Sequence, residues 1–327
     1  MSNSFWKEKH VLVTGCNGFL GSWLTAGLVE AQSDVVGIIR DWVPHSLLAQ
    51  LGLRNRMTIV NGDVCDYELM ERVLAEYEIE IIFHLAAQTI VGIANISPLS
   101  TFETNIKGTW VLLEAARRNT TVKGIIVASS DKAYGAQEKL PYQENAPLMA
   151  RHPYDVSKSC ADMIARAYAH SYGTPAVVTR FSNLYGGGDL NWNRIVPGTI
   201  RSIVQGNQPV IRSDGSPKRD YLYVEDAVSG YMTLGEHIGD EDLHGLAFNF
   251  GMDQPVTALQ MVNTICHISG QSNLKPIILN QAKNEIPDQY LASSRAHKKL
   301  GWHPEYSLED GLVRTMAWYS DFLALSQ

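Results

Sequence analysis

Short apolar runs alternate with amphipathic stretches of helix length through the first half of the chain. The apolar runs predict buried strands over His10–Thr14, Asp34–Ile39, Met57–Val60, Ile79–His84 and Val122–Ala128. Helical patterns lie between them, over about 18–31, 66–77 and 99–118. Strands that are apolar throughout and alternate with helices are typical of a parallel sheet covered on both faces. The pattern therefore predicts an α/β fold with a doubly wound parallel sheet.

The pattern changes after Arg180. Residues 183–220 are rich in Gly, Asn, Pro and Arg, and only the stretch near 197–205 is clearly helical, which is typical of ligand-facing loops. Regular patterns return over 220–228 and 247–251, and we expect these segments to rejoin the first domain. We therefore predict a first domain over 1–182 with return segments at about 220–255, and a smaller lobe formed mostly by 183–327.

Composition narrows the class of protein. Of 327 residues, 45% are hydrophobic, so the chain can bury a substantial core, yet no run approaches the ~18 apolar residues that a membrane span needs. The net charge is −7 and no Lys or Arg tract is present, which argues against binding to nucleic acid or to an anionic membrane. The N-terminal segment is polar and does not resemble a signal peptide, so we expect a cytoplasmic protein.

Neither cysteines nor histidines indicate a metal site. Cys16, Cys65, Cys160 and Cys266 are scattered, with no closely spaced pair, and the histidines show no ligand spacing. We expect ordinary thiols in a reducing compartment and no bound metal.

Three glycines follow the first predicted strand at three-residue spacing and open a helix. They are Gly15, Gly18 and Gly21, with Asn17, Phe19 and Leu20 between them. Glycine at these places allows a tight turn, close approach of the backbone to a pyrophosphate, and close helix–strand packing. The helix N-terminus offers free N–H groups to phosphates. A turn with tolerated glycines is the alternative, but the strand–turn–helix context favours a Rossmann dinucleotide site.

The ends of the next two strands carry groups that select the adenosine half of a dinucleotide. The second strand ends in Arg40-Asp41. An acidic side chain there accepts hydrogen bonds from the ribose 2′-hydroxyl of NAD, whereas an arginine can hold the 2′-phosphate of NADP. The pair points both ways, and we expect NAD with NADP as the alternative. Asp63-Val64 suits the adenine edge, or Asp63 is simply a turn residue.

Tyr154 and Lys158 stand four residues apart in a helical stretch, so both side chains project from one face. A nearby ammonium stabilises phenolate and lowers the pKa of a tyrosine, which can then take the proton of a sugar hydroxyl while hydride leaves the same carbon. The spacing also occurs by chance on solvated helices. Ser129-Ser130 at the end of a predicted strand makes the catalytic interpretation more specific.

These motifs and others along the whole chain resemble the extended short-chain dehydrogenase/reductase family, in its nucleotide-sugar epimerase and dehydratase branch. They are VTGCNGFLGS (13–22), NGDVCD (61–66), HLAAQ (84–88), TNIKGT (104–109), SSDKAYG (129–135), YDVSK (154–158), RFSNLYG (180–186) and RDYLYVEDA (219–227). The resemblance implies that Ser130, Tyr154 and Lys158 form the catalytic triad, and that Asn105 is a structural asparagine near the active site. It also implies a cofactor trough lined, beside His84, by Leu85, Ala86, Ala87 and Gln88.

The two residues after Ser130 decide the branch within this family. Epimerases of this type usually carry small or apolar residues there, whereas 4,6-dehydratases carry an acid and a second ionisable group. Asp131-Lys132 makes the chain most similar to CDP-glucose 4,6-dehydratases, although inverting dehydratases of UDP-N-acetylglucosamine share the couplet. The resemblance implies that Lys132 removes the C5 proton of a 4-keto sugar and that Asp131 protonates the departing C6 oxygen. Two polar residues that merely cap a strand end are the alternative.

The resemblance assigns the substrate, a nucleoside diphosphate sugar, to the smaller lobe. Arg194 and Arg219 are candidates for the pyrophosphate, because guanidinium N–H donors fit phosphate oxygens. Asn183 is a candidate for the phosphates or the sugar, and surface-loop roles are the alternative for these three. Gln88 and Ser130 are candidates for contact with the sugar. Relatives dimerise through helices near 99–118 and 153–172, so we expect a homodimer.

We therefore predict a lyase, an NAD-dependent nucleotide-sugar 4,6-dehydratase. It would oxidise C4, eliminate water across C5 and C6, and return hydride to C6. A 4-epimerase on the same fold is the first alternative, and it would tolerate replacement of Lys132. A non-catalytic nucleotide-binding relative is the second, although such proteins typically lack the tyrosine or the lysine that this chain retains.

Overall fold

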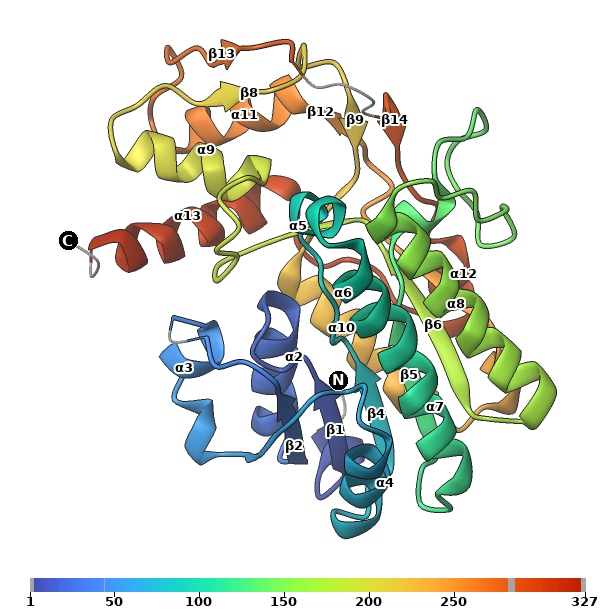
Figure 1. The fold of residues 1–327 in the computed structure, drawn as a ribbon. Coiled ribbons are helices and arrows are strands. Elements are labelled where there is room, and N and C mark those ends of the chain that lie inside the picture. The colour runs from blue at the N-terminus through green and yellow to red at the C-terminus, as the bar shows by residue number, and fades with distance from the viewer. Residues whose placement is uncertain (1–2, 44, 282–285, 325–327) are drawn as a thin grey trace.

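A parallel sheet forms the centre of the molecule (Figure 1). The structure is a computed structural model that describes residues 3–43, 45–281 and 286–324. Seven strands run in the order β11-β6-β5-β4-β1-β2-β3. They are β1 (His10–Thr14), β2 (Asp34–Ile39), β3 (Thr58–Asn61), β4 (Ile81–His84), β5 (Gly124–Ala128), β6 (Ala176–Phe181) and β11 (Ala247–Phe250). All their pairings are parallel, so the predicted doubly wound parallel sheet is confirmed.

Five of these strands correspond to the five predicted apolar runs. β1 and β2 have the predicted bounds, and the ends of the other three differ from prediction by at most two residues. β6 was not predicted as a strand. All six of its side chains are buried, but Thr179 and Arg180 interrupt its apolar run. Arg180 is accommodated in the interior because Asp162 forms an ion pair with it, 2.7 Å apart.

Helices cover both faces of the sheet. α2 (Phe19–Glu30), α10 (Val224–Glu236) and α12 (Ser294–Leu300) share one core with one face. α4 (Tyr67–Glu76), α7 (Gly108–Arg118) and α8 (Pro153–Tyr172) share a second core with the other. Side chains alternate across a strand, and accordingly Val11 and Val13 of β1 belong to the first core while Leu12 belongs to the second.

The segment between β4 and α7 crosses the carboxyl edge of the sheet. It contains α5 (Val91–Ile96), α6 (Pro98–Phe102) and a π-helical turn (Glu103–Lys107) that runs directly into α7. Single π-helical turns widen a helix locally and are frequent at functional sites. Here the turn contains Asn105, whose side chain is buried. Two further short helices, α1 (Asn3–Trp6) and α3 (Leu47–Gln50), flank the N-terminal half of the sheet.

A smaller lobe lies over the carboxyl edge. Its core joins α9 (Ile195–Val204), α11 (Ala258–Ile268) and α13 (Leu308–Ala324). Its strands are short: β7 (Asn183–Tyr185), β8 (Val210–Ile211), β9 (Lys218–Arg219), β10 (Tyr221–Tyr223), β12 (Val256–Thr257), β13 (Ile277–Ile278) and β14 (Asp288–Gln289). The chain passes between the two parts more than once, because α10 packs on α2 and β11 pairs with β6.

Candidate active site

A cleft of about 1150 Å³ lies between the sheet and the smaller lobe. It is at the carboxyl ends of the strands, close to where the strand order reverses between β1 and β4, the usual ligand position in open α/β sheets. The glycine loop, the ends of β4 and β5 and the start of α8 line it from the sheet side. β7, the start of α9 and the segment from β8 to β9 line it from the other lobe. One cavity therefore joins the glycine loop, the predicted catalytic residues and the predicted substrate groups of the smaller lobe, whereas Arg40, Asp41 and Asp63 lie outside its lining.

The glycine loop has the geometry of a phosphate cradle. Gly15 has a φ of +73°, and a Cβ atom there would lie 2.9 Å from backbone atoms of Ala86. A Cβ atom at Gly21 would overlap the carbonyl oxygen of Gly15. The N–H of Gly18 donates to that same oxygen at 3.0 Å, which closes the turn before α2. Only glycine fits at 15 and 21, and the residues present therefore suit a dinucleotide whose phosphates face the start of α2.

The predicted adenosine-side groups form one ion-paired cluster beyond the ends of β2 and β3. Nε of Arg40 lies 2.7 Å from Oδ2 of Asp41, and Nη1 of Arg40 lies 3.9 Å from Oδ2 of Asp63. The Asp41 carbonyl accepts a hydrogen bond from the side chain of Asn17 at 2.8 Å. These acidic partners raise the pKa of Arg40 above its ordinary value. The neighbouring Val64 is directed into the second core, so only its backbone is near this cluster.

The end of β4 is held in place by buried hydrogen bonds. The hydroxyl of Thr14 accepts from the N–H groups of Leu85 and Ala86 and bonds Nδ1 of His84 at 2.9 Å. Burial lowers the pKa of His84 to about 3, so its ring is neutral. Leu85 and Ala87 line the cleft, whereas Ala86 backs the glycine turn. Of the trough residues predicted from the family resemblance, Leu85 and Ala87 therefore line the cleft, and buried hydrogen bonds hold the end of β4 behind them.

Asn105 connects this wall to α8. Its Oδ1 accepts from the N–H of Gln88 at 2.7 Å, and its Nδ2 donates to the Gln88 carbonyl and to the hydroxyl of Ser157. The Gln88 side chain accepts from the N–H of Ile90 and is not part of the cleft lining. Asn105 therefore has a structural position, as predicted from the resemblance. The side chain of Gln88 bonds the neighbouring backbone and does not face the cleft, so the structure does not place it where it could contact the sugar.

Tyr154 and Lys158 lie in the first two turns of α8 and both line the cleft. The ammonium of Lys158 donates to the carbonyl of Ala128 at 2.8 Å, and burial lowers the pKa of Lys158 to about 8. Burial raises the pKa of Tyr154 to about 12, while Arg194 and a hydrogen bond with Ser130 act in the opposite direction. The sequence predicts that Lys158 lowers the pKa of Tyr154. In the structure, the groups that lower this pKa are Arg194 and Ser130.

Asp131 and Lys132 lie at the start of a short 3₁₀ turn (Asp131–Tyr134) after β5. The Ser130 hydroxyl donates to Oδ1 of Asp131 at 3.0 Å. Oδ2 of Asp131 is buried 3.8 Å from Nζ of Lys132 and has no hydrogen-bond partner within the described ranges. Nζ of Lys132 donates to Oε1 of Gln289, and Nε2 of Gln289 donates to the carbonyl of Asp131 at 3.0 Å. Asp131 and Lys132 are therefore held by hydrogen bonds to Ser130 and Gln289, and this polar frame of four residues lines the cleft.

A second carboxyl group faces this frame. Asp155 follows Tyr154, lines the cleft and is 7% exposed. Burial raises its pKa, Lys132 and His152 lower it, and Asp131 raises it further. The sequence analysis did not single out Asp155, although its place beside the tyrosine is the signal that would have identified it.

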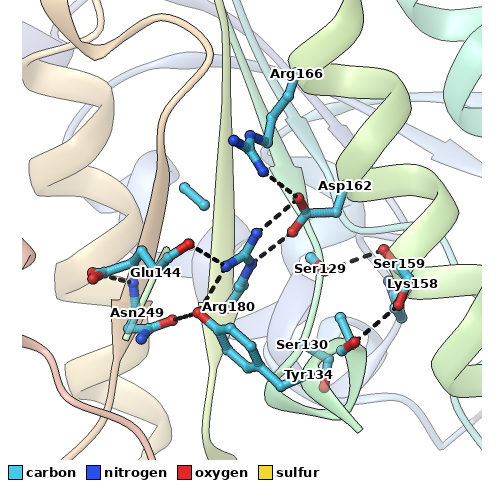
Figure 2. Close-up of polar contacts among 12 residues, drawn as sticks. Ser129, Ser130, Tyr134, Glu144, Lys158, Ser159, Asp162, Arg166, Arg180 and Asn249 are labelled. Atoms are coloured by element: carbon cyan, nitrogen blue, oxygen red, sulfur yellow. Dashed lines mark hydrogen bonds and ion pairs between the residues drawn. The ribbon is translucent and has the colours of Figure 1, made fainter. Parts of the chain in front are cut away.

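A buried network fixes the 3₁₀ turn against α8 and the sheet (Figure 2). Arg180 on β6 donates through Nε and Nη2 to both carboxyl oxygens of Asp162 on α8, and through Nη1 to the hydroxyl of Tyr134 at 2.7 Å. Tyr134 in turn donates to Oδ1 of Asn249 at 2.7 Å. Because Tyr134 ends the turn that begins at Asp131, this network sets where Asp131 and Lys132 lie relative to α8.

The predicted substrate groups of the smaller lobe all line the cleft. Arg194 precedes α9 and donates to Oδ2 of Asp189 at 3.0 Å. Arg219 on β9 is buried, and its guanidinium donates to the carbonyls of Lys218, Ile286 and Pro287. Asn183 donates to the carbonyl of Asp220 at 3.2 Å. These groups line the lobe-side wall opposite the glycine loop, and the sequence analysis missed Trp192, Asn193 and Arg212 in the same wall.

A family model described as GDP-mannose 4,6 dehydratase matches residues 12–316. The chain belongs to this family. A CDP-glucose 4,6-dehydratase from Salmonella typhimurium is 32% identical over 338 aligned positions, which cover 99% of this chain and 94% of that enzyme. A dTDP-glucose 4,6-dehydratase from Haemophilus influenzae is 29% identical over 340 aligned positions, which cover 95% of this chain and 97% of that enzyme. The predicted placement among extended short-chain nucleotide-sugar dehydratases is confirmed.

Solved structures of family relatives share the fold. The dTDP-glucose 4,6-dehydratase of Bacillus anthracis, solved with NAD, has a TM-score of 0.84 and 26% identity over 95% of this chain and 96% of that one. The UDP-glucose 4-epimerase of Thermotoga maritima, solved with UDP-glucose, has a TM-score of 0.86 and 29% identity over 96% of this chain and 99% of that one. Fold alone therefore does not separate dehydratase from epimerase, whereas the 4,6-dehydratases among the curated relatives support the predicted hydro-lyase class.

Two negative findings concern the described residues. Over 3–43, 45–281 and 286–324, no cluster of His, Cys, Asp or Glu side chains is arranged to hold a metal ion. No helix in the same part of the chain combines the length and the apolar character that crossing a membrane requires.

Proposed function

We propose that this chain is an NAD-dependent nucleotide-sugar 4,6-dehydratase, a hydro-lyase, with CDP-glucose as the first substrate to test. The observation that carries the proposal is Asp131-Lys132 facing the same cleft as Ser130, Tyr154 and Lys158. An epimerase needs only Ser130, Tyr154 and Lys158, because its 4-keto intermediate rotates in the site and is reduced again without losing water. The CDP-glucose dehydratase from Salmonella typhimurium supports the choice of sugar nucleotide.

NAD supplies the hydride chemistry in this proposal: when bound, it accepts hydride from C4 and returns it to C6. The chain supports NAD over NADP because Asp41 and Asp63 already compensate the charge of Arg40. Solved dehydratase relatives with NAD support the same choice. Residues 15–21 would hold the phosphates, and Leu85 and Ala87, which line the same cleft, would contact the cofactor.

The side chains supply the proton transfers. Tyr154, as the tyrosinate that Arg194 and Ser130 favour, takes the proton of the C4 hydroxyl as that carbon loses hydride, with Ser130 bonded to the same oxygen. The Ala128 carbonyl holds the ammonium of Lys158, one helical turn further along α8. The resulting ketone makes the C5 proton acidic. Lys132, in its neutral form, removes that proton, and Asp131, in its protonated form, donates to the C6 oxygen, so that one water leaves. The proton on Lys132 exchanges with solvent and returns to C5 as hydride adds to C6. The unbonded Oδ2 of Asp131 is the oxygen available for this transfer.

The two parts of the chain divide this work. Residues 1–182 with the return segments at about 220–255 would bind the dinucleotide, and most of 183–327 would bind the sugar nucleotide. Arg194, Arg219 and Asn183 would contact its phosphates or sugar, since all three line the cleft. The pairing of β11 with β6 supports the return of the second segment.

A cytoplasmic homodimer completes the proposal. The free cysteines are consistent with a reducing compartment. On α7 and α8, Trp110 is 44% exposed and Met163 is 59% exposed, and two such helices from each of two copies would bury both side chains.

Product masses test the reaction directly. CDP-glucose, UDP-glucose, dTDP-glucose, UDP-N-acetylglucosamine and GDP-mannose are each incubated with the protein and NAD in heavy water. We expect one of them to lose one water and retain one deuterium at C5. An unchanged mass for all five contradicts these substrates, and an inverted C4 at unchanged mass supports the epimerase instead.

Lys132→Ala separates the two reactions on one chain. A dehydratase variant without the C5 base should still oxidise C4 but lose water elimination by about 10²–10⁴-fold, the usual contribution of a general base. Reduced nicotinamide would then accumulate under single-turnover conditions. The exposed Lys139 provides the matched control, since Lys139→Ala should leave both steps unchanged. An epimerase would show equal turnover in both variants.

A further inference from the structure

Gln289 is a buried residue that no catalytic motif contains. It lies on β14, 157 positions from Lys132, and its side chain is fully buried. Its carboxamide is used at both ends: Oε1 accepts from Nζ of Lys132, and Nε2 donates to the main-chain carbonyl of Asp131. One side chain therefore contacts both members of the elimination couplet.

A lysine that acts as a base must hold its nitrogen in one place. The lysine side chain is flexible and has several rotatable bonds, and its ammonium alone specifies little direction. The bond to Oε1 fixes the position of Nζ, and the bond from Nε2 fixes which end of the carboxamide faces the lysine. Gln289 thus orients Lys132 as well as contacting it.

The position of Gln289 depends on the smaller lobe. β14 pairs with β9, and Gln289 stands in register with Arg219. The guanidinium of Arg219 donates to the carbonyls of Ile286 and Pro287, on the segment that leads into β14. Lys132, by contrast, follows β5 of the main sheet. The Gln289–Lys132 bond therefore crosses from the lobe that would hold the nucleotide to the sheet that would hold the dinucleotide.

We propose that Gln289 is a positioning residue for the elimination step, which places the amine of Lys132 at the C5 proton once the two lobes enclose the sugar. The proposal rests on the dehydratase function proposed above. It concerns elimination only, because the side-chain hydrogen bonds of Gln289 within the described residues go to Lys132 and Asp131 and not to Tyr154 or Lys158. Among the described residues, the acidic groups that act on Lys132 include Asp131 on the same turn and Asp155 at the start of α8, and His152 acts on the same Asp155 carboxyl group.

Two variants separate positioning from packing. Gln289→Met retains the length of the side chain but removes both hydrogen bonds. Gln289→Glu retains an acceptor for Lys132 and adds a third carboxylate beside Asp131 and Asp155, which favours the charged, inactive ammonium. Gln143→Met changes an exposed glutamine and serves as the control. Each variant is mixed with NAD and the substrate that the wild-type protein dehydrates, in a single turnover in heavy water.

Hydride transfer is followed by the absorbance of reduced nicotinamide, and elimination by loss of water and deuterium at C5. For Gln289→Met we expect C4 oxidation within about twofold of wild type and elimination slower by about 10- to 100-fold, the effect of one lost hydrogen bond to a charged group. For Gln289→Glu we expect slow elimination at neutral pH that recovers as the pH rises, whereas Gln289→Met should stay slow at every pH. Gln143→Met should match wild type.

The outcomes distinguish this inference from the function on which it depends. If wild-type protein eliminates water but both Gln289 variants do so at the wild-type rate, the positioning role is wrong and the dehydratase function stands. If oxidation and elimination fall together in both variants, Gln289 is a packing residue and the positioning role is also wrong. If wild-type protein eliminates no water from any of the five sugar nucleotides, the proposed function itself fails.

Discussion

Tyr154 and Lys158 are four residues apart on α8, yet burial rather than their mutual charge sets the pKa of each. Desolvation raises the pKa of Tyr154 to about 12 and lowers that of Lys158 to about 8. Both shifts favour the neutral form, as expected for groups removed from water. The groups that favour the tyrosinate are Arg194, from the other lobe, and the hydroxyl of Ser130. The chemistry of this helix therefore depends on residues outside it.

Asp220 provides a residue-scale prediction of stability against pH. Its carboxyl group is fully buried, and burial together with Asp253 raises its pKa from 3.8 to about 7. A raised pKa means that the unfolded state releases the proton first as the pH increases. The stability contributed by neutral Asp220 is thus complete below pH 3.8 and is lost as the pH rises towards 7 and beyond.

We expect Asp220→Asn to remove this pH dependence. Relative to wild type, the free energy of unfolding of the variant should increase by about 3–4 kcal/mol between pH 4 and pH 8, since one pKa unit corresponds to about 1.4 kcal/mol. Urea denaturation at a series of pH values measures it. Asp242→Asn, at an exposed position, should follow the wild-type curve. Parallel curves for Asp220→Asn and wild type would contradict the prediction, because they would show that folding does not raise the pKa of Asp220.

At the scale of elements, the close approach of α2 to β1 determines whether the phosphate cradle exists. Gly21 lies in the first turn of α2, where a Cβ atom would overlap the Gly15 carbonyl. Gly21→Ala should force the helix away from the strand. We expect a loss of about 1–3 kcal/mol in the free energy of unfolding, as for other overpacked sites, and NAD binding at least tenfold weaker. Denaturation and NAD titration measure the two effects.

Gly239→Ala is the matched control for this prediction. A Cβ atom at Gly239 would meet no atom within 4 Å, and its backbone angle is ordinary. The variant should retain wild-type stability and NAD affinity. If Gly21→Ala binds NAD as tightly as Gly239→Ala does, the cradle does not depend on this contact and the cofactor site must be reconsidered.

At the scale of the whole molecule, the exposed apolar side chains of α7 and α8 predict association. Trp110→Glu combined with Met163→Glu places two charges on the proposed interface. We expect wild-type protein to sediment as a dimer and the double variant as a monomer, because burying unpaired charges opposes association. Ile278→Glu changes an equally exposed apolar residue on β13 and should leave the dimer intact. A monomeric wild-type protein, or a dimeric double variant, contradicts the prediction.

Local pattern was sufficient for most of the sheet. Apolar runs of four to seven residues identified β1 to β5, because the strands of a sheet covered on both faces bury side chains on both of their own faces. The rule failed at β6, where Arg180 is buried with Asp162 as its partner. That partner lies on another element, and no periodicity along the chain can reveal it.

The chemistry of the cleft divides in the same way. Residue types at short spacing, such as Gly15 to Gly21 and Tyr154 with Lys158, are readable from the chain because the chemistry requires them on one turn or one helix face. Gln289 belongs to no such short-range pattern, because it is 157 positions from Lys132. It reaches Lys132 only because β14 pairs with β9 across the lobe boundary, and that pairing arises from burial of surfaces that are distant in sequence. Short-range patterns thus account for the elements and the reacting groups, while the fold supplies the residue that orients them.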